Sequence, residues 1–486
     1  MQTVLEEDAA VHALPPLSGE DRQRVQGSSL SEVREWALSK AALSPSDLYA
    51  YRLRTLYNST LPVSRLPPET LFRIFDFFRQ DCVSSMWVTK LTGICRYWRD
   101  ILVSSPLAWS SIDLEHSVPF IELCLSRSAD ADLDVVLNET NTDPFASNAP
   151  SVKNELAPHF HRIARLELWS YSLERLQEAQ LLSMLEGPMP RLTELSIWCM
   201  VPTSLQIRLN DAHFPRLQKL SLDHPSVHLY GLMLPSLTML SLSDVARDGQ
   251  PNLNTIIHLL KAAPAMRVLI LRNSGPILPL SAPSPPKRPV VLNSMRVLTF
   301  HGRSTQCRAL LSRLSLPRGV HIWLSVIAQP VTPSIPTDSE EYKSILDDIK
   351  LVGSLSDMRF ASLQVKQRYF ALRADPNRLG HRSKDPLLRI EFRNTYFITN
   401  VQSDNFFQTL LSELPLLFPQ SLTSLSLDGD SMSVVDVKRW GQTLYPSHIC
   451  SNCTSLPVAC SAPSGTWLNS ATGGWSHSCQ SYDASS

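Results

Sequence analysis

A short apolar pattern recurs along most of the chain, and it limits the possible folds more than any other feature of the sequence. The pattern is apolar-x-x-apolar-x-apolar, and its first six copies end at Leu168, Ile197, Leu222, Leu242, Leu271 and Phe300. Weaker copies end at Val365 and Phe392, and a clear copy ends at Leu427. The last three positions of the pattern have period two, so each copy predicts a strand with two apolar side chains on one face.

Segments with helical period lie between several of these strands. Apolar stripes spaced by about 3.6 residues run over 253–260, 307–314 and 407–414. A repeated order of strand, turn and helix predicts parallel strands joined by crossover helices. We therefore expect an α/β solenoid, curved into a horseshoe with the strands inside. The alternative is a non-repetitive α/β domain whose strands happen to be rich in leucine.

The distance between successive copies, 20–29 residues over the first six, falls within the range of leucine-rich repeats. The chain mostly lacks the asparagine of the standard repeat, since the corresponding positions read Trp-Cys-Met, Asp-His-Pro and Ser-Asp-Val. The pattern therefore resembles the irregular leucine-rich repeats that follow many F-boxes rather than the tight extracellular kind.

The stretch Leu66–Trp109 precedes the repeats and predicts two helices. Pro67 and Pro68 suit a helix start, because proline lacks the N–H group that has no partner in the first helical turn. One face of the first helix carries Leu71, Ile74, Phe75 and Phe78. A second stripe of the same period runs over 87–102. Apolar faces of this size on about 45 residues indicate a surface that a partner covers.

This stretch resembles an F-box in the order of its segments LPPETLFRIF, ICRYWRDI and PLAW, with Thr70 where the family usually has a β-branched aliphatic residue. F-boxes dock on a Skp-type adaptor protein, which joins them to a cullin–RING ubiquitin ligase. The alternative is a helical hairpin whose stripes face its own core. Carried over to this chain, the resemblance implies adaptor contacts by Leu66, Pro67, Leu71, Ile74, Phe75, Ile94, Cys95, Trp98 and Trp109.

Composition excludes several classes of function. Lysine and arginine balance aspartate and glutamate at 45 each, which argues against nucleic acid as a partner. No apolar run reaches the length of about 18 residues that indicates a membrane span, and no secretory signal is visible at the start. Nine cysteines in 486 residues favour a reducing compartment, so we expect a cytoplasmic and/or nuclear protein.

Periodicity and composition divide the chain into six parts within an α+β fold class. They are a disordered N-terminus (1–28), a helical lead-in (29–60), the F-box domain (61–112), a linker with the first irregular strands (113–160), the solenoid (161–446) and a disordered tail rich in Cys and Ser (447–486). Proline-rich insertions near 276–289 and 327–341 are typical of extended surface loops.

In a solenoid, the strand positions between the core residues line the concave face. On that basis the candidates for binding a target protein are Trp169, Trp198, Arg165, Glu194 and His301. The two tryptophans are the strongest candidates, because aromatic anchors dominate the binding energy of interfaces. The alternative is that both tryptophans pack under a loop or a flanking helix.

No catalytic residue, cofactor or metal site is expected. The sequence has no Gly-rich phosphate loop, no Gly-x-Ser-x-Gly elbow and no His-Glu-x-x-His motif. Cys450 and Cys453 have zinc-ligand spacing, but Cys460 and Cys479 do not form a second such pair. The resemblance implies a non-catalytic, substrate-recognition subunit of an SCF-type ubiquitin ligase. The alternative is a leucine-rich-repeat scaffold that acts without a cullin.

Overall fold

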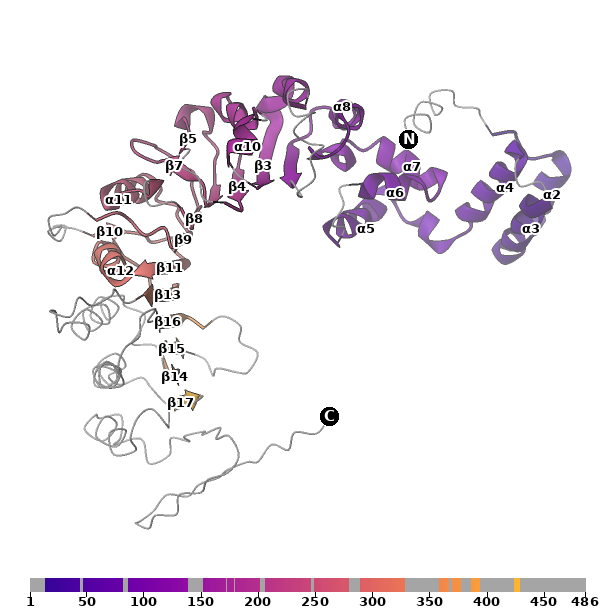
Figure 1. Cartoon of the computed structure of the whole chain (residues 1–486). Coiled ribbons are helices and arrows are strands. Elements are labelled where there is room, and N and C mark those ends of the chain that lie inside the picture. Colours follow the sequence, from indigo (N-terminus) through magenta and orange to yellow (C-terminus); the bar gives the residue numbers. More distant parts are fainter. Residues whose placement is uncertain are drawn as a thin grey trace, which may run out of the picture. The chain divides into compact units, whose positions relative to one another are not determined.

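The structure is a computed structural model, and it describes residues 14–43, 47–81, 86–138, 152–171, 173–178, 180–201, 206–245, 249–278, 289–327, 358–366, 369–376, 386–393 and 424–428. The chain divides into two compact units, Met1–Val136 and Leu137–Ser486. The fold is α+β and contains a large, mostly parallel sheet (Figure 1). The predicted tail, the stripe at 407–414 and most of both proline-rich insertions lie outside the described residues.

Three helices begin the first unit: α2 (Gly19–Gly27), α3 (Leu30–Leu43) and α4 (Leu48–Ser59). Helix α2 lies inside the stretch 1–28, so the expectation of disorder is wrong for these residues. The local signal is Ser18, whose side chain caps the helix by accepting a hydrogen bond from the N–H group of Asp21. Helices α3 and α4 share a small buried core of Ala37, Ala41, Ala50 and Leu53.

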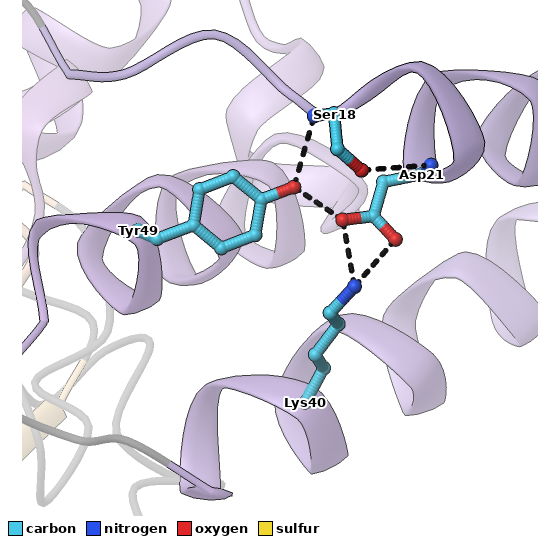
Figure 2. A network of polar contacts seen from close by, with 4 residues as sticks. All are labelled: Ser18, Asp21, Lys40 and Tyr49. Carbon is cyan, nitrogen blue, oxygen red and sulfur yellow. Dashed lines mark hydrogen bonds and ion pairs between the residues drawn. The ribbon is translucent and has the colours of Figure 1, made fainter.

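A polar network centred on Asp21 joins these three helices (Figure 2). The Lys40 ammonium lies 2.6 and 2.7 Å from the two oxygens of the Asp21 carboxylate. The Tyr49 hydroxyl donates a hydrogen bond to the same carboxylate and accepts one from the Ser18 N–H group at 3.1 Å. Burial alone would raise the pKa of Asp21, but the hydrogen bonds from Lys40, Tyr49 and Ser18 outweigh it and hold the pKa below its ordinary value.

The F-box-like stretch forms α5 (Pro68–Asp81), α6 (Trp87–Thr92), α7 (Arg96–Val103) and a short 3-10 helix, η3 (Pro106–Trp109). The single helix expected over 87–102 is therefore two helices. The first ends at Gly93, a poor helix former, and Cys95 takes an extended conformation before α7 begins. Helix α5 packs against both α6 and α7. After η3 come β1 (Ser111–Asp113), α8 (Val118–Arg127) and β2 (Leu133–Asn138), and the two strands pair in parallel.

The first seven strands of the main sheet in the second unit are parallel neighbours: β3 (Ile163–Ser170), β4 (Glu194–Cys199), β6 (Lys219–Asp223), β8 (Met239–Ser243), β9 (Val268–Arg272), β11 (Val297–Arg303) and β13 (His321–Ile327). Their registers align the copies of the pattern into two buried apolar rows. One row is Leu166, Leu195, Leu220, Leu240, Leu269 and Leu298, and the other is Leu168, Ile197, Leu222, Leu242, Leu271 and Phe300. The pattern thus predicts both the strands and their register.

Helices and small strands connect the main strands: η4 (Ala157–Arg162), α10 (Leu173–Glu178), η5 (Leu181–Glu186), β5 (Gln206–Arg208), η6 (Asp211–His213), β7 (Ser226–His228), α11 (Leu253–Ala262), β10 (Val290–Val291), α12 (Ser304–Leu311) and β12 (Leu314–Ser315). Helices α11 and α12 lie on the same side of the strands (Figure 1). Asn252 caps α11 by accepting a hydrogen bond from the Thr255 N–H group at 2.8 Å. The stripe expected over 307–314 is helical only as far as Leu311.

Beyond β13 the series is no longer uniformly parallel, which corrects the expectation that all strands of the irregular solenoid run parallel. The strands are β14 (Phe360–Lys366), β15 (Tyr369–Asp375), β16 (Leu388–Arg393) and β17 (Ser424–Asp428). Strand β16 pairs in parallel with β13, whereas β15 runs antiparallel to both β16 and β14. The reason is the connection between β14 and β15, which is too short for a crossover and allows only a hairpin.

Candidate functional site

The apolar stripe of α5 is wider than the core that it faces. Leu71 and Phe75 are buried, whereas Ile74, Phe77 and Phe78 on the adjoining part of the helix surface are 45%, 68% and 39% exposed. With 3.6 residues per turn, the five side chains span an arc of about 160°. The helix therefore uses one edge of its stripe for its own core and leaves the other edge uncovered within the described residues.

Three of the nine predicted adaptor contacts lie inside the fold. Leu71, Phe75 and Trp109 are fully buried, so these side chains cannot meet a partner without unfolding. The Trp109 indole donates a hydrogen bond to the Leu102 carbonyl oxygen at 2.8 Å, and the Arg127 guanidinium lies 4.6 Å from the centre of its ring. These three residues hold the helical unit together, and their assignment as contacts is corrected here.

The other six predicted contacts are open to solvent to different degrees. Ile94 is 55% exposed, because the turn between α6 and α7 directs it outward. Pro67 is exposed, and Leu66 and Cys95 are partly buried. Trp98 is also partly buried, with its ring centre 4.9 Å from that of Phe75. Ile74, Ile94 and Pro67 are thus the predicted contacts that are exposed in this unit.

Sequence reasoning missed Phe77, Phe78 and Leu107, which are among the most exposed apolar side chains of this stretch. Phe78 belongs to the predicted apolar stripe but not to the predicted adaptor contacts, and Phe77 belongs to neither. The signal was present in the sequence, since three aromatic residues within four positions cannot all face one narrow core. We call Ile74, Phe77, Phe78, Ile94 and Leu107 the exposed apolar set.

The second candidate surface is the face of the main sheet opposite the two apolar rows. Its side chains come from the strand positions between the core residues, as the period of two requires. The register places Trp169, Trp198, Asp223, Ser243, Arg272 and His301 in one cross-strand row. The row begins with two aromatic side chains and continues with polar and charged ones. It is chemically unlike the buried rows on the other face.

Trp169 and Trp198 lie side by side at the start of this row. Their ring centres are 5.3 Å apart with an angle of 35° between the planes, and Trp169 is 44% exposed. Tyr171 and Met200, at the ends of the same two strands, are also exposed. Trp169 is therefore open to solvent, as a binding residue should be, and is not covered by a loop or a flanking helix in the described part of the chain.

Charged side chains border the tryptophan pair. Arg165 lies 3.4 Å from Glu194 and 3.7 Å from Glu167, and Lys219 forms an ion pair with Glu194 from the other side. All of these groups are at least a quarter exposed in their side chains, so the pairs contribute little stability. Their effect is to fix the orientation of Arg165 and Lys219 toward Glu194.

Burial raises the pKa of Asp223, the carboxyl group next to Trp198 in the row, and nearby Asp244 raises it further. His224, whose Nδ1 lies 3.0 Å from the carboxylate, and Arg272 act in the opposite direction without cancelling the shift. Asp223 is therefore a half-buried carboxyl group whose pKa lies above its ordinary value, mainly because of burial.

His301 belongs to a different cluster from the tryptophan pair. Its ring centre lies 4.9 Å from that of Trp323, edge to face, and the Arg389 guanidinium lies 4.5 Å from the Trp323 ring on the other side. Arg389 also forms an ion pair with the buried Glu391. The five predicted target-binding residues thus fall into two groups, with His301 apart from the other four.

Within the described ranges, no group of three or more His, Cys, Asp or Glu side chains is arranged to hold a metal ion. In that same part of the chain, no helix has both the length and the apolar character to cross a membrane. Comparison with family models, with curated proteins and with solved structures finds no match to this chain.

Proposed function

We propose that this chain is the substrate-recognition subunit of an SCF-type cullin–RING ubiquitin ligase. In this proposal the F-box-like stretch docks on a Skp-type adaptor, and the repeated sheet binds the target protein as a leucine-rich-repeat-like solenoid. The observation that carries the proposal is the exposed apolar edge of α5. It lies in the same stretch whose order of segments resembles an F-box, so two independent lines of reasoning support one surface.

The exposed area of the exposed apolar set limits the binding free energy that it can contribute. Burying a whole Phe, Leu or Ile side chain stabilises by about 1.5–3 kcal/mol. Scaled by the exposed fractions, covering the exposed apolar set contributes roughly 4–8 kcal/mol. Association itself costs about 4–15 kcal/mol. The set is therefore the centre of an interface, and the surrounding polar residues of the box supply the rest of the contacts.

The chain contributes no chemistry in this proposal. A target held on the sheet face is brought close to a ubiquitin-charged enzyme elsewhere in the complex, and the raised effective concentration accelerates transfer. Cys124 does not serve as a ubiquitin acceptor in this proposal. Burial raises the pKa of the Cys124 thiol to about 12, which leaves it protonated.

The proposal is tested by the double variant Ile74→Asp, Phe77→Asp in the full-length chain. Both side chains are exposed, so the variant should keep the thermal stability of the wild type while losing measurable binding to a purified Skp-type adaptor. The matched control is Leu38→Asp, which places a charge on a leucine that is 52% exposed on α3. The control should bind the adaptor as the wild type does.

Unchanged adaptor affinity in the double variant would refute the assignment of this surface. An equal loss of adaptor affinity in the Leu38→Asp control would mean that the effect is not local to α5.

Co-purification separates the ligase subunit from the cullin-independent scaffold. A chain that recovers adaptor and cullin together is a ligase subunit, whereas recovery of adaptor alone favours the cullin-independent scaffold.

A further inference from the structure

Two of the five exposed or half-buried tryptophan rings in the described part of the chain, those of Trp36 and Trp323, have a cation beside them. Lys40 lies 5.5 Å from the centre of the Trp36 ring, and Arg389 lies 4.5 Å from that of Trp323. The fully buried Trp109 has Arg127 in the same arrangement. Cations are attracted to the negative face of an aromatic ring, and tryptophan is the strongest partner.

The tryptophan pair on β3 and β4 differs in this respect. Among the described residues, no lysine or arginine lies over the ring of Trp169, which is exposed, or over that of Trp198, which is half-buried. Two basic side chains on the same face, Arg165 and Lys219, are held by Glu194. Arg165 is four residues before Trp169 on the same strand, which is about 13 Å at the rise of a β-strand.

The same face of the sheet contains an arginine held between a tryptophan ring and a carboxylate. At Trp323, the stacked Arg389 also forms an ion pair with Glu391 of its own strand. The cation is thus held by a ring on one side and a carboxylate on the other. At the tryptophan pair, the register puts the half-buried carboxylate of Asp223 next to Trp198 on the neighbouring strand. The ring and the carboxylate are both present, and no lysine or arginine of the described residues stacks on this ring as Arg389 does on Trp323.

We propose that Trp169, Trp198 and Asp223 bind an arginine side chain presented by a partner protein. Arginine fits better than lysine, because a planar guanidinium can stack on an indole and still donate hydrogen bonds to a carboxylate. The inference rests on the proposed function, since it names the class of residue that the target would present to this face of the sheet.

The test uses the full-length chain labelled with fluorotryptophan and followed by fluorine NMR. The resonances of Trp169 and Trp198 are assigned with the variants Trp169→Phe and Trp198→Phe. The probes are short Gly/Ser peptides with one central arginine, and the same peptides with citrulline, which has nearly the same shape without the charge. The arginine peptide should shift both resonances and leave that of Trp36, which Lys40 already covers, in place.

The expected effects are set by the strength of a cation–π contact. The citrulline peptide should bind about tenfold more weakly than the arginine peptide, and Asp223→Asn should weaken arginine binding by a similar factor. The control Tyr230→Ala removes an exposed aromatic ring elsewhere in this unit and should change nothing. Equal shifts from both peptides, or no shift with the arginine peptide up to its solubility limit, would overturn the inference.

This experiment and the adaptor experiment fail independently. The peptide titration reports on β3, β4 and β6, whereas adaptor binding reports on α5 and its neighbours. If the adaptor-binding experiment fails and the arginine peptide still binds, the sheet is a peptide-binding surface and the proposed ligase role is wrong.

Discussion

Replacing Asp21 by asparagine should loosen α2, α3 and α4 together, because one carboxylate joins all three helices. The Asp21 side chain is 7% exposed, and it accepts hydrogen bonds from the Lys40 ammonium and the Tyr49 hydroxyl. Hydrogen bonds to charged groups contribute about 1.5–3 kcal/mol each. Lys40 is 39% exposed and stays hydrated when the negative charge is lost, which lowers the cost. We therefore expect a loss of about 2 kcal/mol of local stability.

Hydrogen exchange measured by mass spectrometry on the whole chain checks this value. A loss of about 2 kcal/mol corresponds to a rise of roughly 30-fold in the opening equilibrium of these helices. The matched control is Glu20→Gln, which removes the same charge from the exposed residue next to Asp21 and should change exchange by less than about twofold. Wild-type protection of the three helices in Asp21→Asn would refute the reasoning.

The effect should also depend on pH with a definite sign. A carboxyl group with a lower pKa in the folded state stabilises the fold above its unfolded pKa, and this stability is lost as the pH falls through the folded pKa. The ordinary pKa of Asp21 is 3.8, and the folded value is lower. The difference in protection between wild type and Asp21→Asn should therefore be complete at neutral pH and shrink below pH 4 (approximately). A difference that is independent of pH would contradict the role of the charge.

Three further predictions concern the two units separately. Leu240→Ala, in the middle of a buried row, should lower the free energy of unfolding by about 2–5 kcal/mol in urea, whereas Ser221→Ala on the opposite face should change it by less than about 0.5 kcal/mol. Burial raises the pKa of Cys124 to about 12, so its thiol should resist iodoacetamide in the native chain and react only on unfolding. Faster alkylation of Cys124 than of the half-buried Cys95 would contradict this prediction. Trp109→Phe loses its hydrogen bond to Leu102 and should lower the melting temperature measurably, and an unchanged melting temperature would show that the bond contributes nothing.

The sequence was sufficient for the strands from β3 to β11 because their pattern encodes the buried face, and the helical segments between several strands indicate that neighbouring strands run parallel. It was not sufficient at β13, where Gly319, with a positive φ of 80°, occupies the first apolar position of the pattern. It also could not show that β15 reverses direction, because periodicity alone does not distinguish parallel from antiparallel strands. The two-residue connection before Tyr369 was the available signal.

The candidate site was predicted less completely than the fold. A stripe of helical period identifies apolar residues, but it does not say where the core ends and the exposed surface begins. Phe75 and Phe77 differ by two positions in α5, and one is buried while the other is the most exposed apolar side chain of the set. That difference depends on how closely α6 and α7 approach α5, which is a property of tertiary packing.

The pairing of β13 with β16 has a consequence for how the protein is made. About 60 residues separate the end of β13 from the start of β16, and at about 5–20 residues per second a ribosome needs roughly 3–12 s to synthesise them. During that interval the outer edge of β13 is complete but lacks its partner, while β11 already covers the other edge. Open strand edges recruit strands of other chains. Slow codons in this interval should therefore lower the soluble yield of the protein more than slow codons elsewhere.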